Sequence, residues 1–147
     1  MNEDVRRECL FKEVKVIQGV IERMARNSFM IKGWTVTLVV GTLILKGAWY
    51  QAMIAYIPLL AFWALDAYFL WQERLYRKLY NWVIENRLQT EEFLFDMNAY
   101  RFREQVDSVV QVMFSITLFW FYGWIGLLLT IYLGLSAVSA VFTCAGW

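Results

Sequence analysis

The sequence contains no histidine and only two cysteines, and these absences limit the chemistry that it can carry. Histidine is the commonest metal ligand and the usual general base near neutral pH. Cys9 and Cys144 stand near opposite ends of the chain, so they form neither a CxxC pair nor a set of zinc ligands. Glycine-rich phosphate loops and the GxSxG and HExxH motifs are also missing. We therefore expect a protein that is not an enzyme and that holds no metal and no cofactor.

Charge and proline are scarce, whereas apolar residues are abundant. Of the 147 residues, 18% are charged, one is proline and 60% are hydrophobic. Soluble domains are about 25% charged and about half apolar, and a short chain buries only part of its apolar surface. The net charge of +1 gives no overall attraction to nucleic acid or to anionic lipid. The composition predicts an integral membrane protein with lipid as a partner.

Three apolar runs are long enough to cross a membrane. They cover roughly 29–45, 52–71 and 109–147, and the last contains no charged residue. A bilayer core of about 30 Å takes about 20 helical residues, so the last run is long enough for two spans. Gly123 is the expected turn between them. We predict an all-α, multi-pass helical bundle with four spans in two transmembrane hairpins.

Most of the charged residues lie between and before these runs and divide the chain into four parts. Residues 1–28 predict a cytoplasmic amphipathic helix, 29–72 the first transmembrane hairpin, 73–107 a cytoplasmic helical connector and 108–147 the second hairpin. In the connector, Leu75, Leu79, Trp82 and Val83 recur at helical spacing. The connector helix is expected to break near residues 89–90, where Thr90 to Phe93 resembles a new helix start.

The basic residues predict the orientation, because short cytoplasmic loops carry an excess of Lys and Arg. Thirteen of the 14 precede the body of the first span, Lys32 included, or lie in the connector, and Lys46 alone is left for the other side. Both termini are therefore expected in the cytoplasm. No cleavable signal peptide follows the charged residues 1–13, so the first span is expected to act as the targeting signal. Trp49, Tyr50 and the aromatic residues 120–124 are expected to form an interfacial belt on the external side.

Asp66 is a lone carboxylate within the second apolar run, and Lys32 lies near the start of the first. A charge at such depth is costly unless it is paired or hydrated. A Lys32–Asp66 pair would compensate it, as would Asp66 with Asn27 and Ser28. The pair is interpreted either as a structural contact that fixes the hairpin register, as a gate that couples cytoplasmic helices to a pore, or as part of a proton relay.

Small and hydroxyl-bearing residues mark the last run. Gly126, Thr130 and Gly134 are spaced four apart and share one helix face, and Thr117 carries another hydroxyl. Small residues let helix backbones approach closely in lipid. We interpret these four residues as helix-packing or pore-lining candidates. Because no ring of charges accompanies them, a pore would be weakly selective or gated by a hydrophobic constriction.

Cations and aromatic residues alternate in the connector, around Arg74 to Arg87 and again around Tyr100 to Arg103. Such alternation suits a phosphate-bearing ligand, with stacking for bases and cations for phosphates. Basic residues beside a span also set topology and contact anionic lipid, and acidic residues neutralise much of this charge. Both interpretations stay open.

Two strings, IERMARNSFMIKGW at 21–34 and FWALDAYFLWQERLYRKLY at 62–80, resemble the membrane effectors of bacterial antiphage defence systems. The resemblance is to the Hailong-type channel proteins and covers about residues 15–80. It implies a homo-oligomeric ion channel, with a tetramer as the working subunit number, in the bacterial inner membrane. It also implies a partner nucleotidyltransferase whose short nucleotide product gates the channel.

On that reading, five cations become candidates for contacts with ligand phosphates: Arg74, Arg77, Lys78, Arg101 and Arg103. Lys32 and Asp66 become candidates for gating or coupling. The predicted function is an effector channel that is gated from the cytoplasm and depolarises the membrane when open, causing abortive infection. The alternative is a non-conducting membrane anchor or scaffold that recruits a cytoplasmic partner.

Overall fold

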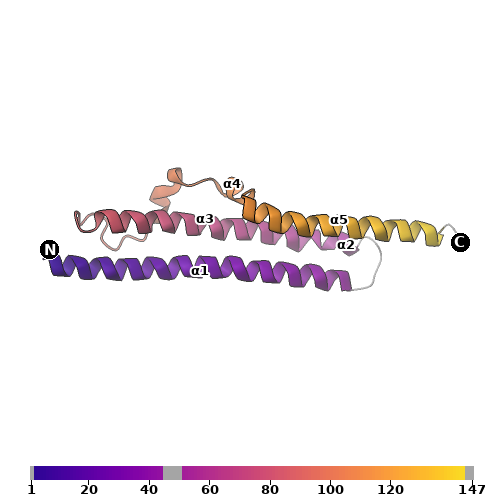
Figure 1. The fold of residues 1–147 in the computed structure, drawn as a ribbon, viewed down its shortest axis with the longest axis horizontal. Helices are drawn as coiled ribbons and strands as arrows, with labels where there is room; N and C mark the ends of the chain where they lie inside the picture. The colour runs from indigo at the N-terminus through magenta and orange to yellow at the C-terminus, as the bar shows by residue number, and fades with distance from the viewer. Residues whose placement is uncertain (1, 45–50, 145–147) are drawn as a thin grey trace. The chain divides into compact units, whose positions relative to one another are not determined.

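The computed structural model describes residues 2–44 and 51–144, with side chains for 2–44 and 53–139. The predicted positions of Lys46, Trp49 and Tyr50 lie outside the described residues. The described chain is all-helical, as predicted, with five α-helices and one 3-10 helix (Figure 1). In chain order these are α1 (Glu3–Ile44), α2 (Gln51–Ile54), α3 (Tyr56–Asn86), η1 (Ala99–Gln105), α4 (Val109–Met113) and α5 (Ile116–Cys144).

The chain divides into two compact units, and α1 and α3 each contribute to both. Unit 1 comprises residues 1–28 and 68–112, and unit 2 comprises 29–67 and 113–147. The charges are distributed very unequally. Of the 14 Lys and Arg and the 13 Asp and Glu residues, only Lys32, Lys46 and Asp66 belong to unit 2.

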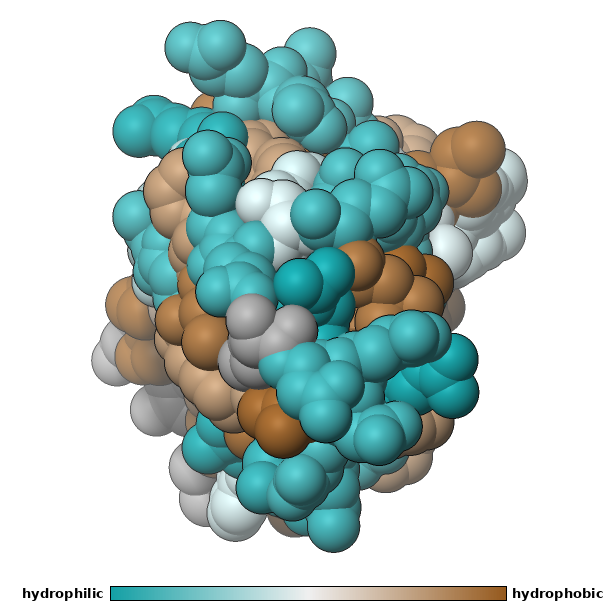
Figure 2. Space-filling view, turned by 90° about the vertical axis from the view of Figure 1, so that its left-hand side faces the viewer, coloured by the Kyte–Doolittle hydropathy of each residue, from teal (hydrophilic) through white to brown (hydrophobic). Residues whose placement is uncertain are grey.

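In unit 1, α1 and α3 pack antiparallel along an apolar stripe. Leu75, Leu79 and Val83 are each at most 1% exposed, so the predicted helical stripe is confirmed for these three residues of the connector, whereas Trp82 is only partly buried. They share the core with Ile17 of α1, which is fully buried. Figure 2 faces the start of α1 and the loop after α3, where hydrophilic residues cover much of the surface and hydrophobic residues emerge between them.

The loop after α3 differs from the prediction. The helix ends at Asn86, whose carbonyl oxygen accepts hydrogen bonds from the amides of Gln89 and Thr90. The expected helix start at Thr90–Phe93 is wrong, because this segment forms turns. Phe93 and Phe95 have φ angles of 55° and 58°. This left-handed conformation costs a non-glycine residue about 1–2 kcal/mol, so other contacts must stabilise the loop.

In unit 2, each long helix buries one narrow stripe and leaves the rest of its surface exposed. The α1 stripe contains Ile31, Thr35 and Val39, the α3 stripe Leu59, Asp66 and Ala67, and the α5 stripe Leu118, Tyr122 and Leu129. Relative to the first residue of each set, spacings of four, seven, eight and eleven residues place each set on one helix face. Large side chains on the other faces are open, among them Phe29 at 78%, Ile57 at 68% and Leu135 at 67% exposure.

The predicted turn at Gly123 is wrong, because α5 runs without interruption from Ile116 to Cys144. Glycine within a helix costs only about 1 kcal/mol relative to alanine, and the run contains neither a proline nor a charge that would stop the helix. The chain instead breaks earlier, between α4 and α5. There the indole nitrogen of Trp63 donates a hydrogen bond of 2.9 Å to the carbonyl oxygen of Met113.

Two helices are long and apolar enough to cross a membrane by length and composition, Glu3–Ile44 and Ile116–Ser139. Only 22% and 17% of their most apolar windows are buried inside the protein. Core helices of soluble proteins bury most of their apolar surface, and extended exposed apolar surface marks contact with membranes or other chains. By length, composition and exposed apolar surface, the two helices are therefore compatible with crossing a membrane.

The continuity of α5 is tested by replacing Gly123 with alanine. Nothing lies within 4 Å of a Cβ added at this position, so Gly123→Ala should stabilise the helix by up to about 1 kcal/mol. Thermal unfolding in detergent would show an unchanged or raised midpoint. Gly123→Pro is the control and should lower the midpoint strongly, since proline breaks a helix interior. A clear loss of stability in the alanine variant would contradict a helical Gly123.

Candidate functional site

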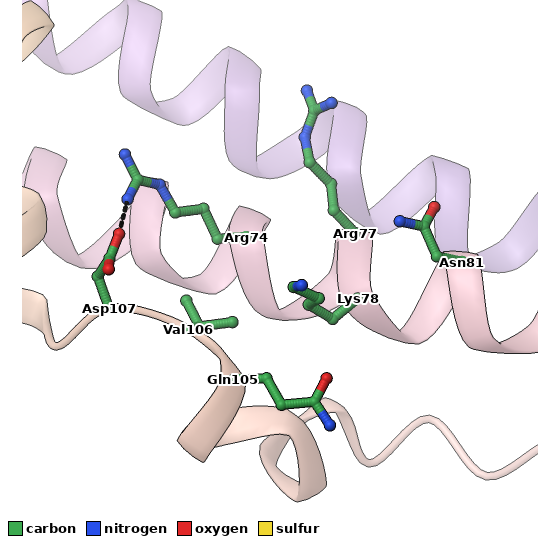
Figure 3. Close-up of a pocket in the computed structure, with 7 residues that line it drawn as sticks. All are labelled: Arg74, Arg77, Lys78, Asn81, Gln105, Val106 and Asp107. Carbon is green, nitrogen blue, oxygen red and sulfur yellow. Dashed lines mark hydrogen bonds and ion pairs between the residues drawn. The ribbon is translucent and has the colours of Figure 1, made fainter.

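A basic pocket of about 250 Å³ lies in unit 1 between α3 and the segment that follows η1 (Figure 3). Arg74, Arg77, Lys78 and Asn81 share one face of α3 because they are three, four and seven residues apart. Gln105, Val106 and Asp107 line the opposite side. The structure thus brings together three of the five cations that the sequence predicted as phosphate contacts.

Two of these cations already have carboxylate partners. Nη1 of Arg74 lies 2.7 Å from Oδ2 of Asp107, as Figure 3 shows. Arg77 donates hydrogen bonds of 2.8 and 2.6 Å from Nε and Nη2 to Oε1 of Glu73. These pairs preserve the local charge balance in the absence of an anion, and a phosphate would compete with Asp107 for Arg74.

Lys78 differs from the two arginines because it forms no ion pair with any of the described residues. Its ammonium group and the carboxamides of Asn81 and Gln105 offer donors to the pocket. An ammonium beside two carboxamides suits a ligand that combines a phosphate with neutral hydrogen-bonding groups. Gln105 and Asp107 were not predicted from the sequence, since their approach depends on the path of the chain through and after η1. Asn81 was not predicted either, although its spacing from Arg74, Arg77 and Lys78 was a usable signal.

Arg101 and Arg103 do not line this pocket. The guanidinium carbon of Arg101 lies 4.3 Å from the ring centroid of Trp82, 4.6 Å from that of Phe93 and 4.9 Å from that of Phe102. Such contacts stabilise a cation over aromatic faces. Burial lowers the pKa of Arg101 from its usual value, and its guanidinium remains charged at neutral pH. Arg103 is exposed on η1.

The two coupling candidates, Lys32 and Asp66, meet inside unit 2. Nζ of Lys32 lies 2.5 Å from Oδ2 of Asp66, whose side chain is fully buried. The hydroxyl of Tyr122 donates a hydrogen bond of 3.0 Å to the same carboxylate oxygen. Since the three residues stand on α1, α3 and α5, this Lys32–Asp66–Tyr122 cluster joins all three long helices through one carboxylate.

Tyr122 was expected in an external aromatic belt, and this expectation is wrong. It is 1% exposed and lies beside Asp66, with its ring stacked on Trp63 at a centroid distance of 5.9 Å. The sequence offered one usable signal, because a buried tyrosine hydroxyl needs a polar partner and Asp66 is the one carboxylate in the apolar part of the chain. The register of α5 against α3 was needed to connect them.

The four helix-packing candidates separate into two pairs. A Cβ added at Gly126 would lie 3.7 Å from Cδ2 of Leu59, so its lack of a side chain allows close packing against α3. The hydroxyl of Thr130 lies 2.8 Å from that of Tyr56 and donates to the Gly126 carbonyl oxygen. Thr117 is exposed, and Gly134 has open space around it. Gly126 and Thr130 thus make contacts within the chain, whereas Thr117 and Gly134 face outward.

A second buried ion pair, which the sequence analysis did not identify, joins Glu13 of α1 to Arg87 at the end of α3. The two side chains are 1% and 0% exposed, and Nη2 of Arg87 lies 2.9 Å from Oε1 of Glu13. Arg87 also donates to the carbonyl oxygens of Glu92 and Phe93, at 2.7 and 3.0 Å. Glu13 accepts the amide of Phe95 at 2.6 Å. These contacts hold the left-handed loop in place.

Comparisons with known proteins give no relative. The chain matches no protein family, no curated protein and no solved structure. Within the described residues, no group of three His, Cys, Asp or Glu side chains is arranged to hold a metal ion. The basic pocket and the Lys32–Asp66–Tyr122 cluster are therefore the features from which a function can be inferred.

The cluster is tested by removing one member at a time. Asp66→Asn leaves the Lys32 ammonium without its carboxylate, and breaking a buried pair in this way costs about 3–5 kcal/mol. Tyr122→Phe removes one hydrogen bond to a charged group, which costs about 1.5–3 kcal/mol. Denaturant unfolding in detergent measures both losses.

The control is the double variant Lys32→Met/Asp66→Leu. Replacing both charges by apolar side chains is often neutral, so this variant should be more stable than Asp66→Asn. If Asp66→Asn unfolded at the wild-type midpoint, the cluster would have no structural role.

Proposed function

We propose that the protein is a homo-oligomeric channel of a bacterial inner membrane that responds to a nucleotide-type ligand on its cytoplasmic side. As the effector of an antiphage defence system, it would depolarise the membrane when open. The resemblance of residues 15–80 to such effectors supports this proposal. The observation that carries it is the basic pocket of unit 1, whose cations and carboxamides match the groups of a nucleotide.

The proposed topology has three crossings in place of the four expected from the sequence. The first two are the apolar part of α1 and the run at 52–71, which includes α2 and the first half of α3. The third is α5, since its 29 residues extend over about 43 Å at 1.5 Å per residue and exceed one bilayer core. The positive-inside rule places unit 1 in the cytoplasm, so the C-terminal end of α5 lies on the opposite side.

The basic pocket is the proposed ligand site. Lys78 and the two arginines contact phosphate groups, while Asn81 and Gln105 contact neutral polar groups of the ligand. Arg101 serves a structural role in this proposal, because three aromatic rings already surround its guanidinium. This leaves the pocket with three cations, which suits a ligand with few phosphates.

The Lys32–Asp66–Tyr122 cluster is the proposed coupling element. A buried ion pair has few alternative arrangements, since separating its charges in an apolar surrounding is costly. Movement of α1 or α3 is therefore transmitted to α5 through Asp66. Because α1 and α3 also continue into unit 1, the same two helices connect the ligand site to the cluster.

The alternative function is a non-conducting anchor or scaffold that recruits a cytoplasmic partner. The observation in its favour is the exposed apolar loop of unit 1, in which Phe93 and Phe95 are 53% and 46% exposed. Such side chains anchor many protein contacts. The scaffold predicts a partner that binds this loop and no ion flow through the purified protein.

Conductance in planar bilayers distinguishes these functions and tests the pocket. Short oligonucleotides added on the cytoplasmic side should change the conductance of the wild-type protein. Lys78→Gln removes a charge-assisted contact worth about 1.5 kcal/mol, so about ten times more oligonucleotide should be needed for the same change.

Lys12→Gln is the matched control, since Lys12 is exposed and pairs with Glu8 outside the pocket. Its response should equal that of the wild type. Absence of conductance under every oligonucleotide condition would eliminate the channel and leave the scaffold. Equal responses of the Lys78 and Lys12 variants would eliminate the pocket as the ligand site.

A further inference from the structure

The loop at Phe93, Leu94 and Phe95 places three apolar side chains on the surface of unit 1. They are 53%, 37% and 46% exposed, and the two phenylalanines have left-handed backbones. Non-glycine residues adopt this conformation only where their surroundings enforce it. Here the buried Arg87–Glu13 pair enforces it through the carbonyl oxygen of Phe93 and the amide of Phe95. The loop is thus a fixed projection with an apolar tip.

Acidic residues flank this tip on both sides, with Glu91 and Glu92 before it and Asp96 after it. Glu91 pairs with Arg6 at 3.2 Å and Asp96 lies 4.0 Å from Arg101, so the three carboxylates outnumber these two cations by one. The surroundings disfavour contact with an anionic membrane, because carboxylates are repelled by anionic lipid headgroups. They favour a partner surface that combines an apolar side chain with cations.

Such a surface exists on α1 of the same unit. Phe11 is 73% exposed, and Arg7 and Lys15 stand one helical turn before and after it on the same face. Arg7 pairs with Glu3 at 2.7 Å, whereas Lys15 forms no ion pair with the residues that the structure describes. Phe11 is two residues from Glu13, which places it about 160° around the helix at about 100° per residue. Since Glu13 faces the loop of its own chain, Phe11 faces away from it.

The loop and the Phe11 face lie at nearly the same level along α1. The amide of Phe95 is bonded to Glu13, and Phe11 is only about 3 Å from Glu13 along the helix axis. In a membrane ring, the symmetry axis is normal to the bilayer and all copies have the same height. Surfaces at one level can therefore meet between neighbouring copies, even though they cannot meet within one chain.

We infer that the Phe93–Phe95 loop of one copy docks on the Phe11 face of the next copy. This inference rests on the proposed membrane oligomer and names the contact that builds it. The contact is heterologous, because two different surfaces meet, and such contacts close into rings when the rotation allows. Aromatic side chains at its centre and opposite charges around them match the composition of stable interfaces.

Cysteine crosslinking in native membranes tests this contact with the full-length chain. In a background of Cys9→Ser and Cys144→Ser, the variant Phe11→Cys/Leu94→Cys is oxidised with copper phenanthroline. A heterologous contact predicts a ladder of covalent dimers and higher multiples, while each single variant stays monomeric. Disulfides form only between Cα atoms about 4.4–6.8 Å apart, so the ladder reports close approach.

The matched control is Val16→Cys/Leu94→Cys. Val16 is 50% exposed and lies about 140° around the helix from Phe11, on the side of Glu13, so a disulfide that it forms with Leu94 would lie within one chain, and only crosslinks between copies are compared. Its crosslinking should be at least tenfold slower. Equal rates at the two positions, no ladder, or dimers from Leu94→Cys alone would overturn the inference, the last because it indicates a contact between identical loops.

Native mass and conductance separate this inference from the proposed function. Oligomers that conduct but give no ladder of covalent multimers from Phe11→Cys/Leu94→Cys would support the channel and refute the docking contact. A ladder from a protein that never conducts would support the contact and refute the channel. A monomer by native mass that also fails to conduct would refute both.

Discussion

The ion pair of Lys32 and Asp66 sets the arrangement of the helices in unit 2. Asp66 is completely buried in a unit that contains no other acidic residue. A carboxylate in such surroundings requires a cation and a hydrogen-bond donor. Lys32 of α1 supplies the first and Tyr122 of α5 supplies the second. The apolar stripes could pack in several registers, and this polar contact favours the one register that satisfies Asp66.

Unit 1 depends on a contact of the same kind. Glu13 and Arg87 are both buried, and they connect α1 to the residue that directly follows α3. Here the pair also organises the chain beyond α3, because Arg87 binds loop carbonyls and Glu13 binds a loop amide. Removing either partner would leave a buried charge, so the ion pair is costly to break. Its hydrogen bonds to the loop therefore hold the two phenylalanines in their left-handed conformation. Each unit thus has one ion pair that fixes the relation of α1 to α3.

Helical character, the apolar runs and the Lys32–Asp66 pair could be predicted from the sequence, because each depends on local spacing or on a single unmatched charge. The Glu13–Arg87 pair could not, since its members are 74 residues apart in charged segments. One signal was present, because Glu13 stands four residues before Ile17 on the buried stripe of α1. A charge on an apolar stripe indicates a buried partner.

The turn within the last apolar run was predicted incorrectly for a different reason, because α5 continues through Gly123. Length alone suggested two spans, but a helix needs a breaker to turn, and glycine in a charge-free run is a weak one. The basic pocket was predicted in part. Arg74, Arg77 and Lys78 share a helix face, which spacing reveals, whereas Arg101 contacts aromatic rings instead of the pocket. Whether a cation lines the pocket or contacts aromatic rings depends on tertiary packing.

The central claim is that the chain crosses the membrane three times, with unit 1 in the cytoplasm. Topology reporters fused after Trp147 test it directly, because alkaline phosphatase is active only outside the cytoplasm and green fluorescent protein folds to its fluorescent form inside. The account predicts an active phosphatase and a dark fluorescent protein at this position. Fusions after Thr90 serve as the reference and should be fluorescent. Bright fluorescence and inactive phosphatase after Trp147 would contradict the account, because α5 would then not be a single crossing.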